Sequence, residues 1–145
     1  LFSAIRDNTI DNFICLTGDI HTSWAIELVD DPRKRPVPPL GPIGVIPTPV
    51  SERFGVEFVT PSITSPGLPD PGGSLSTLVD TNNPHIQAAD LSMHGYAIME
   101  ITPSETTCTW YHLATILDEE DENETLWRAF SVAAGGDRTL TDITP

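Results

Sequence analysis

The sequence is poor in positive charge and contains no long apolar run. Its 145 residues include seven Lys and Arg against 21 Asp and Glu, which gives a formal net charge of −14 at pH 7. Residues 33–35 hold three of the seven cations, so the cations do not form a basic face. We therefore expect no nucleic-acid binding driven by charge. No run of about 18 apolar residues occurs, so we expect no membrane-spanning helix.

Cysteine is also scarce. The two cysteines, Cys15 and Cys108, lie in strand-like segments, and neither has a second Cys or a His at metal-binding spacing. We interpret both as small core residues rather than as a disulfide or a redox pair. With 39% hydrophobic residues, a chain of this length predicts one domain that buries roughly 70% of its unfolded surface.

The first half of the sequence predicts short ordered segments separated by loops. A helix is expected at the start of the chain, over residues 1–6, because its apolar residues share one face. The apolar run 13–16 predicts a strand buried on both faces, and residues 23–29 and 55–59 predict two more strands. The proline-dense residues 30–49 predict a long irregular excursion, and residues 60–67 predict a turn-rich loop.

The second half predicts a hairpin between two irregular stretches. Residues 68–83 have the composition of a loop, and a turn or short helix is expected to open at 83–85. Residues 96–101 and 107–113 predict an antiparallel hairpin with a five-residue loop. Residues 118–124 are acidic at six of seven positions, which indicates a solvated connection. A last strand is expected at 130–133.

The candidate site follows the predicted strand 13–16 directly. In open α/β sheets, ligands bind at the carboxyl ends of strands, and Gly18 is expected to bend the chain so that Asp19 and His21 converge. A carboxylate oxygen with a neutral imidazole nitrogen suits iron, zinc or manganese, and the oxygen also accepts calcium. Taken alone, the pattern Gly-Asp-x-His is weak, because an Asp that caps a turn and a hydrogen-bonded His also explain it.

The surrounding sequence extends this pattern. Residues 13–25, Phe-Ile-Cys-Leu-Thr-Gly-Asp-Ile-His-Thr-Ser-Trp-Ala, resemble the last metal-binding motif of the alkaline phosphatase D (PhoD-like) family of metallophosphoesterases. Further matches follow in the family's order at 55–59 with 62–65, at 83–86 and at 94–96. The resemblance implies an α/β fold that is half of a two-sheet metallophosphoesterase-type sandwich, strand-rich with few helices. Residues 1–145 would be the carboxyl-terminal half of that catalytic domain.

The resemblance also implies a function. It implies a hydrolase of phosphomonoesters or phosphodiesters with a binuclear or multinuclear metal centre, built from iron with calcium, or with zinc or manganese. Asp19 and His21 match the motif positions that ligate the metals and are the candidate catalytic residues, and His85 is the candidate substrate-binding residue. The family's other ligands lie on the amino-terminal side of the motif. That missing half is therefore the expected partner, and the chain alone is expected to be inactive. Family resemblance further implies export to the periplasm or the exterior of a bacterium.

An alternative function is a stand-alone β-rich module that binds calcium or a protein through its acidic loops without catalysis. Residues 118–124 lack the glycine and ligand spacing of an EF-hand loop, so calcium is only an alternative there. His94 is expected at the surface or in a turn, and His112 at the edge of the core. Ser62 and Ser65 have no paired base at local spacing and are expected to line a loop. Trp24 is expected to pack against the metal-binding loop.

Overall fold

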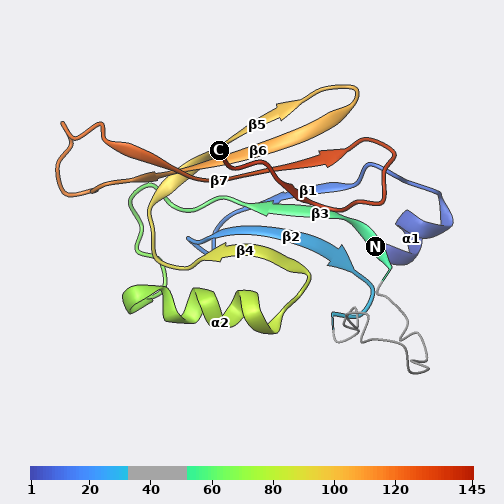
Figure 1. The fold of residues 1–145 in the computed structure, drawn as a ribbon, viewed down its shortest axis with the longest axis horizontal. Coiled ribbons are helices and arrows are strands. Elements are labelled where there is room, and N and C mark those ends of the chain that lie inside the picture. The colour runs from blue at the N-terminus through green and yellow to red at the C-terminus, as the bar shows by residue number, and fades with distance from the viewer. Residues whose placement is uncertain (33–51) are drawn as a thin grey trace.

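The computed structural model describes residues 1–32 and 52–145, so most of the irregular excursion expected at 30–49 lies outside the described residues. Two four-stranded sheets form the molecule, with a short helix at the start of the chain and a longer helix beside the first sheet (Figure 1). The elements in chain order are α1 (Phe2–Asp7), β1 (Ile14–Thr17), β2 (Ser23–Val29), β3 (Arg53–Val59), the 3-10 turn η1 (Pro71–Gly73), α2 (Ser74–Asn82), β4 (Ile86–Asp90), β5 (Gly95–Ile101), β6 (Glu105–Leu113), β7 (Glu124–Ala133) and β8 (Thr141–Asp142). The strand-rich, two-sheet architecture expected from the sequence is confirmed. Neither helix of the described part has the length and apolar content needed to cross a membrane.

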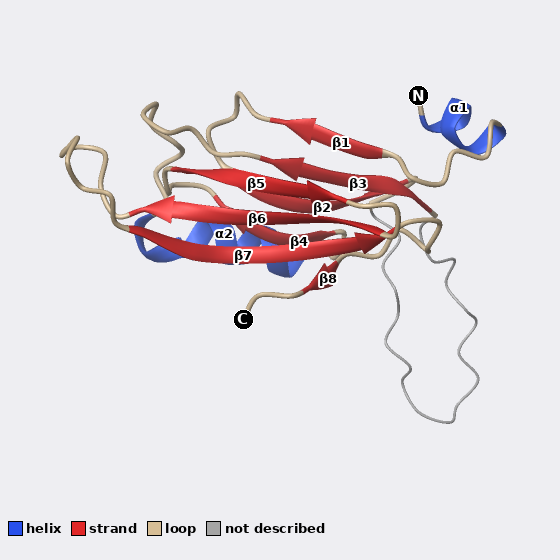
Figure 2. Cartoon of the chain, turned by 90° about the horizontal axis from the view of Figure 1, so that it is seen from above, coloured by secondary structure: helices blue, strands red, loops and turns tan. Residues whose placement is uncertain are grey.

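The two sheets pack face to face around one core. The first sheet has the strand order β1-β3-β2-β4, in which β1 runs parallel to β3, and the second has the antiparallel order β5-β6-β7-β8. Figure 2 shows the second sheet lying across the first. Trp110 on β6 is fully buried and meets Phe58 of β3 edge-on, with ring centroids 5.6 Å apart. Its indole Nε1 donates to the carbonyl of Val59 over 2.9 Å, so one side chain joins the two layers through both packing and a hydrogen bond.

Strand β1 lies at an edge, which corrects the expectation that it is buried on both faces. Among the described strands it is the outermost of the first sheet, and Leu16, although it pairs with Phe58 on the face toward the second sheet, is 59% exposed. The apolar run correctly predicted a strand. A run of apolar residues does not show how many neighbours the strand has or which of its faces another layer covers.

Helix α2 shows that the loop predicted over 68–83 is wrong. The carboxylate of Asp70 accepts hydrogen bonds from the backbone N–H groups of Leu75 (2.7 Å) and Ser76 (2.9 Å) and from the Ser76 hydroxyl (2.6 Å). Asp70 thus satisfies two of the free backbone donors of the first helical turn, and the Ser76 hydroxyl bond is the main reason that the pKa of Asp70 is lowered. The helix then lies along β4 on the outer side of the first sheet (Figure 1).

The predicted hairpin is confirmed as β5 and β6, but its connection is shorter than expected. Strand β5 continues to Ile101 and strand β6 begins at Glu105, so the connection consists of residues 102–104. Strand β7 begins at Glu124 rather than at residue 130, and the sequence did not predict β4 or β8. The acidic stretch before β7 is largely exposed, as expected. Both cysteines are free, and Cys108 is buried in the core.

Candidate functional site

Residues 18–22, which we call the site loop, connect the carboxyl end of β1 to β2. Asp19 and His21 adopt positive φ angles of 70° and 59°, whereas Gly18 does not. The sharp bend expected at Gly18 is therefore made at the two candidate ligands themselves. Asp and His occupy this left-handed region more often than most residues, at a cost of roughly 1–2 kcal/mol. Backbone outliers of this kind cluster at functional sites.

The ring of His21 is held by the neighbouring loop, residues 60–67. Its Nδ1 lies 3.0 Å from the carbonyl oxygen of Pro66. A carbonyl can only accept a hydrogen bond, so Nδ1 carries the proton and the lone pair remains on Nε2. This loop also lies close to the backbone of the site loop. A Cβ added at Gly67 would lie only 2.9 Å from the carbonyl oxygen of His21. Ligating histidines usually donate their second ring N–H to such an oxygen.

Asp19 is exposed, and His21 is half-buried on the same loop. The loop thus offers one carboxylate and one imidazole nitrogen at its surface. Across residues 1–32 and 52–145, no group of three or more His, Cys, Asp or Glu side chains comes together in a way that could hold a metal ion. In the part of the chain that the structure describes, Asp19 and His21 are therefore two donors rather than a complete coordination shell.

The end of the site loop is anchored in the protein interior. Thr22 and Ser23 are fully buried, and the indole of Trp24 donates to the hydroxyl of Thr22. The Ser23 hydroxyl lies 3.2 Å from Nε2 of His112 on β6, and the His112 ring stacks on Trp127 of β7 at 4.9 Å. Burial lowers the pKa of His112. The expected core role of His112 is confirmed, and the buried pair joins the site loop to the second sheet.

His85 lies away from the site loop along β2, and its assignment as a substrate-binding residue stays a prediction. Its carbonyl accepts a hydrogen bond from the backbone N–H of Glu27 over 2.7 Å, near the far end of β2. The β2–β4 register pairs Ile26 with Ile86 at this end, while Asp90 pairs at the end next to the site loop. The Nδ1 atom of His85 is buried without a hydrogen-bond partner, and burial lowers the pKa of the ring.

The remaining polar residues shape the loops around the site. The Ser62 hydroxyl accepts the backbone N–H of Ser65 over 2.7 Å, and the Ser62 carbonyl accepts the N–H of Gly95 over 3.0 Å. His94 is half-buried before β5, and its carbonyl accepts the N–H of Leu113. Both serines thus line the loop, as expected. Sequence reasoning missed the role of Pro66, because a contact made by a backbone carbonyl requires no particular side chain.

Comparisons with known proteins point to one family of phosphatases. Residues 1–110 match the family model of PhoD-like phosphatases. The alkaline phosphatase D of Bacillus subtilis (strain 168) is 33% identical over 105 residues, which cover 72% of this chain and 15% of that protein. A solved structure, described as the structure of PhoD, aligns with 99% of this chain and 24% of that chain, with a TM-score of 0.75 and 23% identity. The fold is therefore shared, and this chain spans a quarter or less of the length of either protein.

Proposed function

Since this chain belongs to the PhoD-like phosphatase family, we propose that it takes part in the hydrolysis of phosphate esters. Either monoesters or diesters are compatible with the family. The observation that carries the proposal is the site loop, which has the family's motif and carries both an oriented imidazole and an exposed carboxylate.

Asp19 and His21 are the proposed metal ligands. The bond from Nδ1 of His21 to the carbonyl of Pro66 leaves Nε2 as the atom that can ligate. One oxygen and one nitrogen donor fit iron, zinc or manganese, and the Asp19 oxygen also fits calcium. Iron with calcium is the pair that the family resemblance favours. Bound ions would supply positive charge and Lewis-acid polarisation of the phosphoryl group.

The charge of the chain supports a metal centre. At a net charge of −14, the protein repels an anionic phosphate ester unless cations reverse the local field. Bound metal ions are the largest local charges in sites of this kind. The role of the site loop is then to hold its two donors in fixed directions, with Thr22 and Ser23 anchored in the core beneath them.

Further ligands are proposed to come from the amino-terminal part of the catalytic domain, which in the family precedes the motif of the site loop. The open edge of β1 supports this arrangement, because the strand ends at the site loop and exposes Leu16. An exposed strand edge is a template for further pairing. Export across a bacterial membrane stays a prediction from the family resemblance.

The alternative of a calcium-binding or protein-binding module gains no support from the acidic stretch. Its side chains shape their own turn, since Asp118 accepts the N–H of Glu120 and Asp121 accepts the N–H of Asn123. Among the described residues, which include this stretch, no three or more His, Cys, Asp or Glu side chains come together in a way that could hold a metal ion.

The test is a chimaera in which this chain replaces the matching segment of the Bacillus subtilis alkaline phosphatase D. We expect His21→Ala to lower metal content and aryl phosphodiester turnover together, the turnover by a factor on the order of 10² or more. Arg128→Gln is the control, because Arg128 pairs with Asp142 on the exposed surface of β7 and β8, and it should leave both quantities unchanged. Normal metal content and normal turnover in His21→Ala would refute the proposed role of the site loop.

Asp19→Asn separates metal binding from turn formation in the same chimaera. If Asp19 only shapes the turn, the change should cost about 1 kcal/mol or less, because asparagine also tolerates a positive φ. If Asp19 is a ligand, turnover should fall while the melting temperature stays unchanged, and added metal should restore part of the lost turnover. Unchanged turnover without added metal would show that Asp19 is a turn residue.

A further inference from the structure

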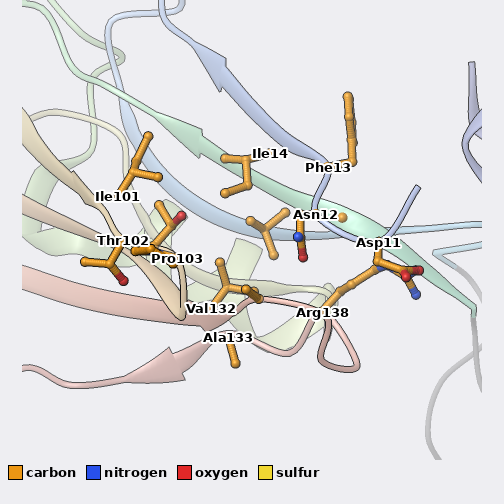
Figure 3. A pocket seen from close by; sticks show the side chains of 14 residues that line it. Asp11, Asn12, Phe13, Ile14, Ile101, Thr102, Pro103, Val132, Ala133 and Arg138 are labelled. Atoms are coloured by element: carbon orange, nitrogen blue, oxygen red, sulfur yellow. The ribbon is translucent and has the colours of Figure 1, made fainter. Parts of the chain in front are cut away.

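A pocket of about 430 Å³, which Figure 3 shows from close by, is lined by residues from the start of β1, whereas the site loop follows the other end of that strand. At the start of β1, Ile14 pairs with Val56. From the second sheet, Ile101 at the end of β5 and Val132 near the end of β7 line the same pocket. Its volume lies in the range of sites for small organic molecules, about 300–1,000 Å³.

The pocket has an apolar interior and a charged side. Ile14, Val56, Ile101 and Val132 contribute the apolar surface from both sheets. Figure 3 shows Arg138 and Asp11 together on one side of the pocket, and the hairpin turn with Pro103 on the opposite side. A ligand that fills the pocket would therefore meet apolar side chains along its body and a guanidinium at one end.

The guanidinium of Arg138 has N–H donors that its contacts within the protein do not fully use. Its Nη2 donates to Oδ1 of Asp11 over 2.8 Å, and its Nη1 makes a longer contact of 3.4 Å with the carbonyl of Arg53. The Nε atom is buried without a hydrogen-bond partner. An arginine can offer Nε and one Nη together to the two oxygens of a carboxylate. Asp11 accepts only one such bond and its side chain is 52% exposed, so it can turn into solvent.

The backbone holds Arg138 in place at a conformational cost. Its φ of 62° lies in the left-handed region, which is unfavourable for a residue with a long side chain. Hydrogen bonds hold the chain on both sides of Arg138. The N–H of Gly135 donates to the Asn12 side chain over 2.7 Å, and the N–H of Leu140 donates to the Glu27 carboxylate over 3.1 Å. Strained backbone that its surroundings maintain is typical of ligand clamps.

We propose that this pocket binds a small organic carboxylate with an apolar body, of the size of a medium-chain fatty acid. The carboxylate pairs with Nε and Nη2 of Arg138 in place of Asp11, and the body lies between the apolar residues of the two sheets. The existing pair with Asp11 supports this choice of head group, because it shows a carboxylate accepted by this guanidinium. A dianionic phosphate head would find one guanidinium beside a competing acid, which favours a single negative charge.

The test is a titration of the chain with sodium octanoate, followed by two-dimensional amide NMR, with octanol and octyl phosphate as comparison ligands. We expect saturable shifts at Ile14, Ile101 and Val132, and an affinity for octanoate about 10-fold or more above that for octanol, as for a charge-assisted pair. Equal affinity for octanoate and octanol, or tighter binding of octyl phosphate, would overturn the assignment. Shifts confined to Leu16 and the open edge of β1 would overturn it as well.

Two variants change the affinity in opposite directions. Arg138→Gln should weaken octanoate about 10-fold and leave octanol unchanged, whereas Asp11→Asn should strengthen octanoate about 3-fold because a competing carboxylate is lost. Arg128→Gln is the matched control, since Arg128 pairs with Asp142 on the exposed surface of β7 and β8. If Arg138→Gln does not fold, the affinity of the Asp11→Asn variant for octanoate tests the proposal. An unchanged or lowered affinity in that variant refutes it.

Discussion

Replacing His112 with alanine should destabilise the sandwich by about 3 kcal/mol. The residue is 5% exposed, its Nε2 lies 3.2 Å from the Ser23 hydroxyl, and its ring stacks on Trp127. Alanine leaves the fully buried hydroxyl of Ser23 without a partner, which costs about 1–3 kcal/mol. Loss of the ring stack adds about 0.5–1.5 kcal/mol.

Thermal and urea unfolding of the purified chain measure this loss. For a domain of this size, about 3 kcal/mol corresponds to a fall in melting temperature of roughly 6–12 °C. Ser23→Ala and the double variant complete a cycle whose coupling energy, about 0.5–1.5 kcal/mol, isolates the hydrogen bond. Thr109→Ala, on the outer face of the same strand, is the control and should stay within about 0.5 kcal/mol.

The pH dependence of stability gives a second readout. Burial lowers the pKa of His112 below its ordinary value of 6.5, so the unfolded chain binds the proton more readily than the folded chain. Stability should therefore be complete above pH 6.5 and decrease as the pH falls below it. His85 has the same sign, so His112→Ala should reduce this dependence without abolishing it.

Two results would refute this account of His112. One is a melting temperature of His112→Ala within about 1 °C of the unaltered chain, which corresponds to well under 1 kcal/mol. The other is an unchanged loss of stability below pH 6.5 in that variant. Either result would mean that the Ser23–His112 contact does not hold the site loop to the second sheet.

Three further predictions concern single positions. Gly67→Ala should displace the site loop and cost about 1–3 kcal/mol, because its Cβ would be wedged between the carbonyl oxygens of Leu91 at 2.7 Å and His21 at 2.9 Å; an unshifted His21 ring resonance would contradict this. The chain alone should self-associate or bind a hydrophobic dye through the open β1 edge, and Leu16→Lys should reduce this in sedimentation experiments, since Leu16 is 59% exposed. Cys108, whose pKa burial raises to about 12, should resist alkylation at pH 8 while Cys15 reacts faster, and equal rates by mass spectrometry would argue against the buried position.

Much of the strand content could be predicted from local pattern. Alternating and apolar runs placed β1, β2, β3 and the hairpin of β5 and β6, because strand periodicity depends on neighbouring residues alone. The length of the hairpin turn and the start of β7 were less accurate, since cross-strand pairing decides where a strand ends. Trp110 is fully buried between the sheets of this chain, and the hairpin pattern alone does not show which layer covers it.

The candidate site, too, could be predicted only in part from local pattern. The motif alone predicted Asp19 and His21, because the loop directly follows the strand that carries it. The distance of His85 from the site loop could not be predicted, because no local pattern shows which end of β2 the residues before β4 will reach. Helix α2 was missed because its first turn is capped by Asp70, which lies outside the helix in a Pro-Gly-rich stretch.

The sequence by itself thus determined the type of most elements, the charge of the chain and the two donors of the site loop, since all of these depend on residue identity and short-range spacing. Tertiary structure alone decided which ring nitrogen of His21 is free, through the carbonyl of Pro66, 45 positions away in the chain. It also brought Ser23 to His112 across 89 positions, and Arg138 to Asp11 across 127. Contacts over such separations form only when the two sheets pack, because no local periodicity specifies their partners.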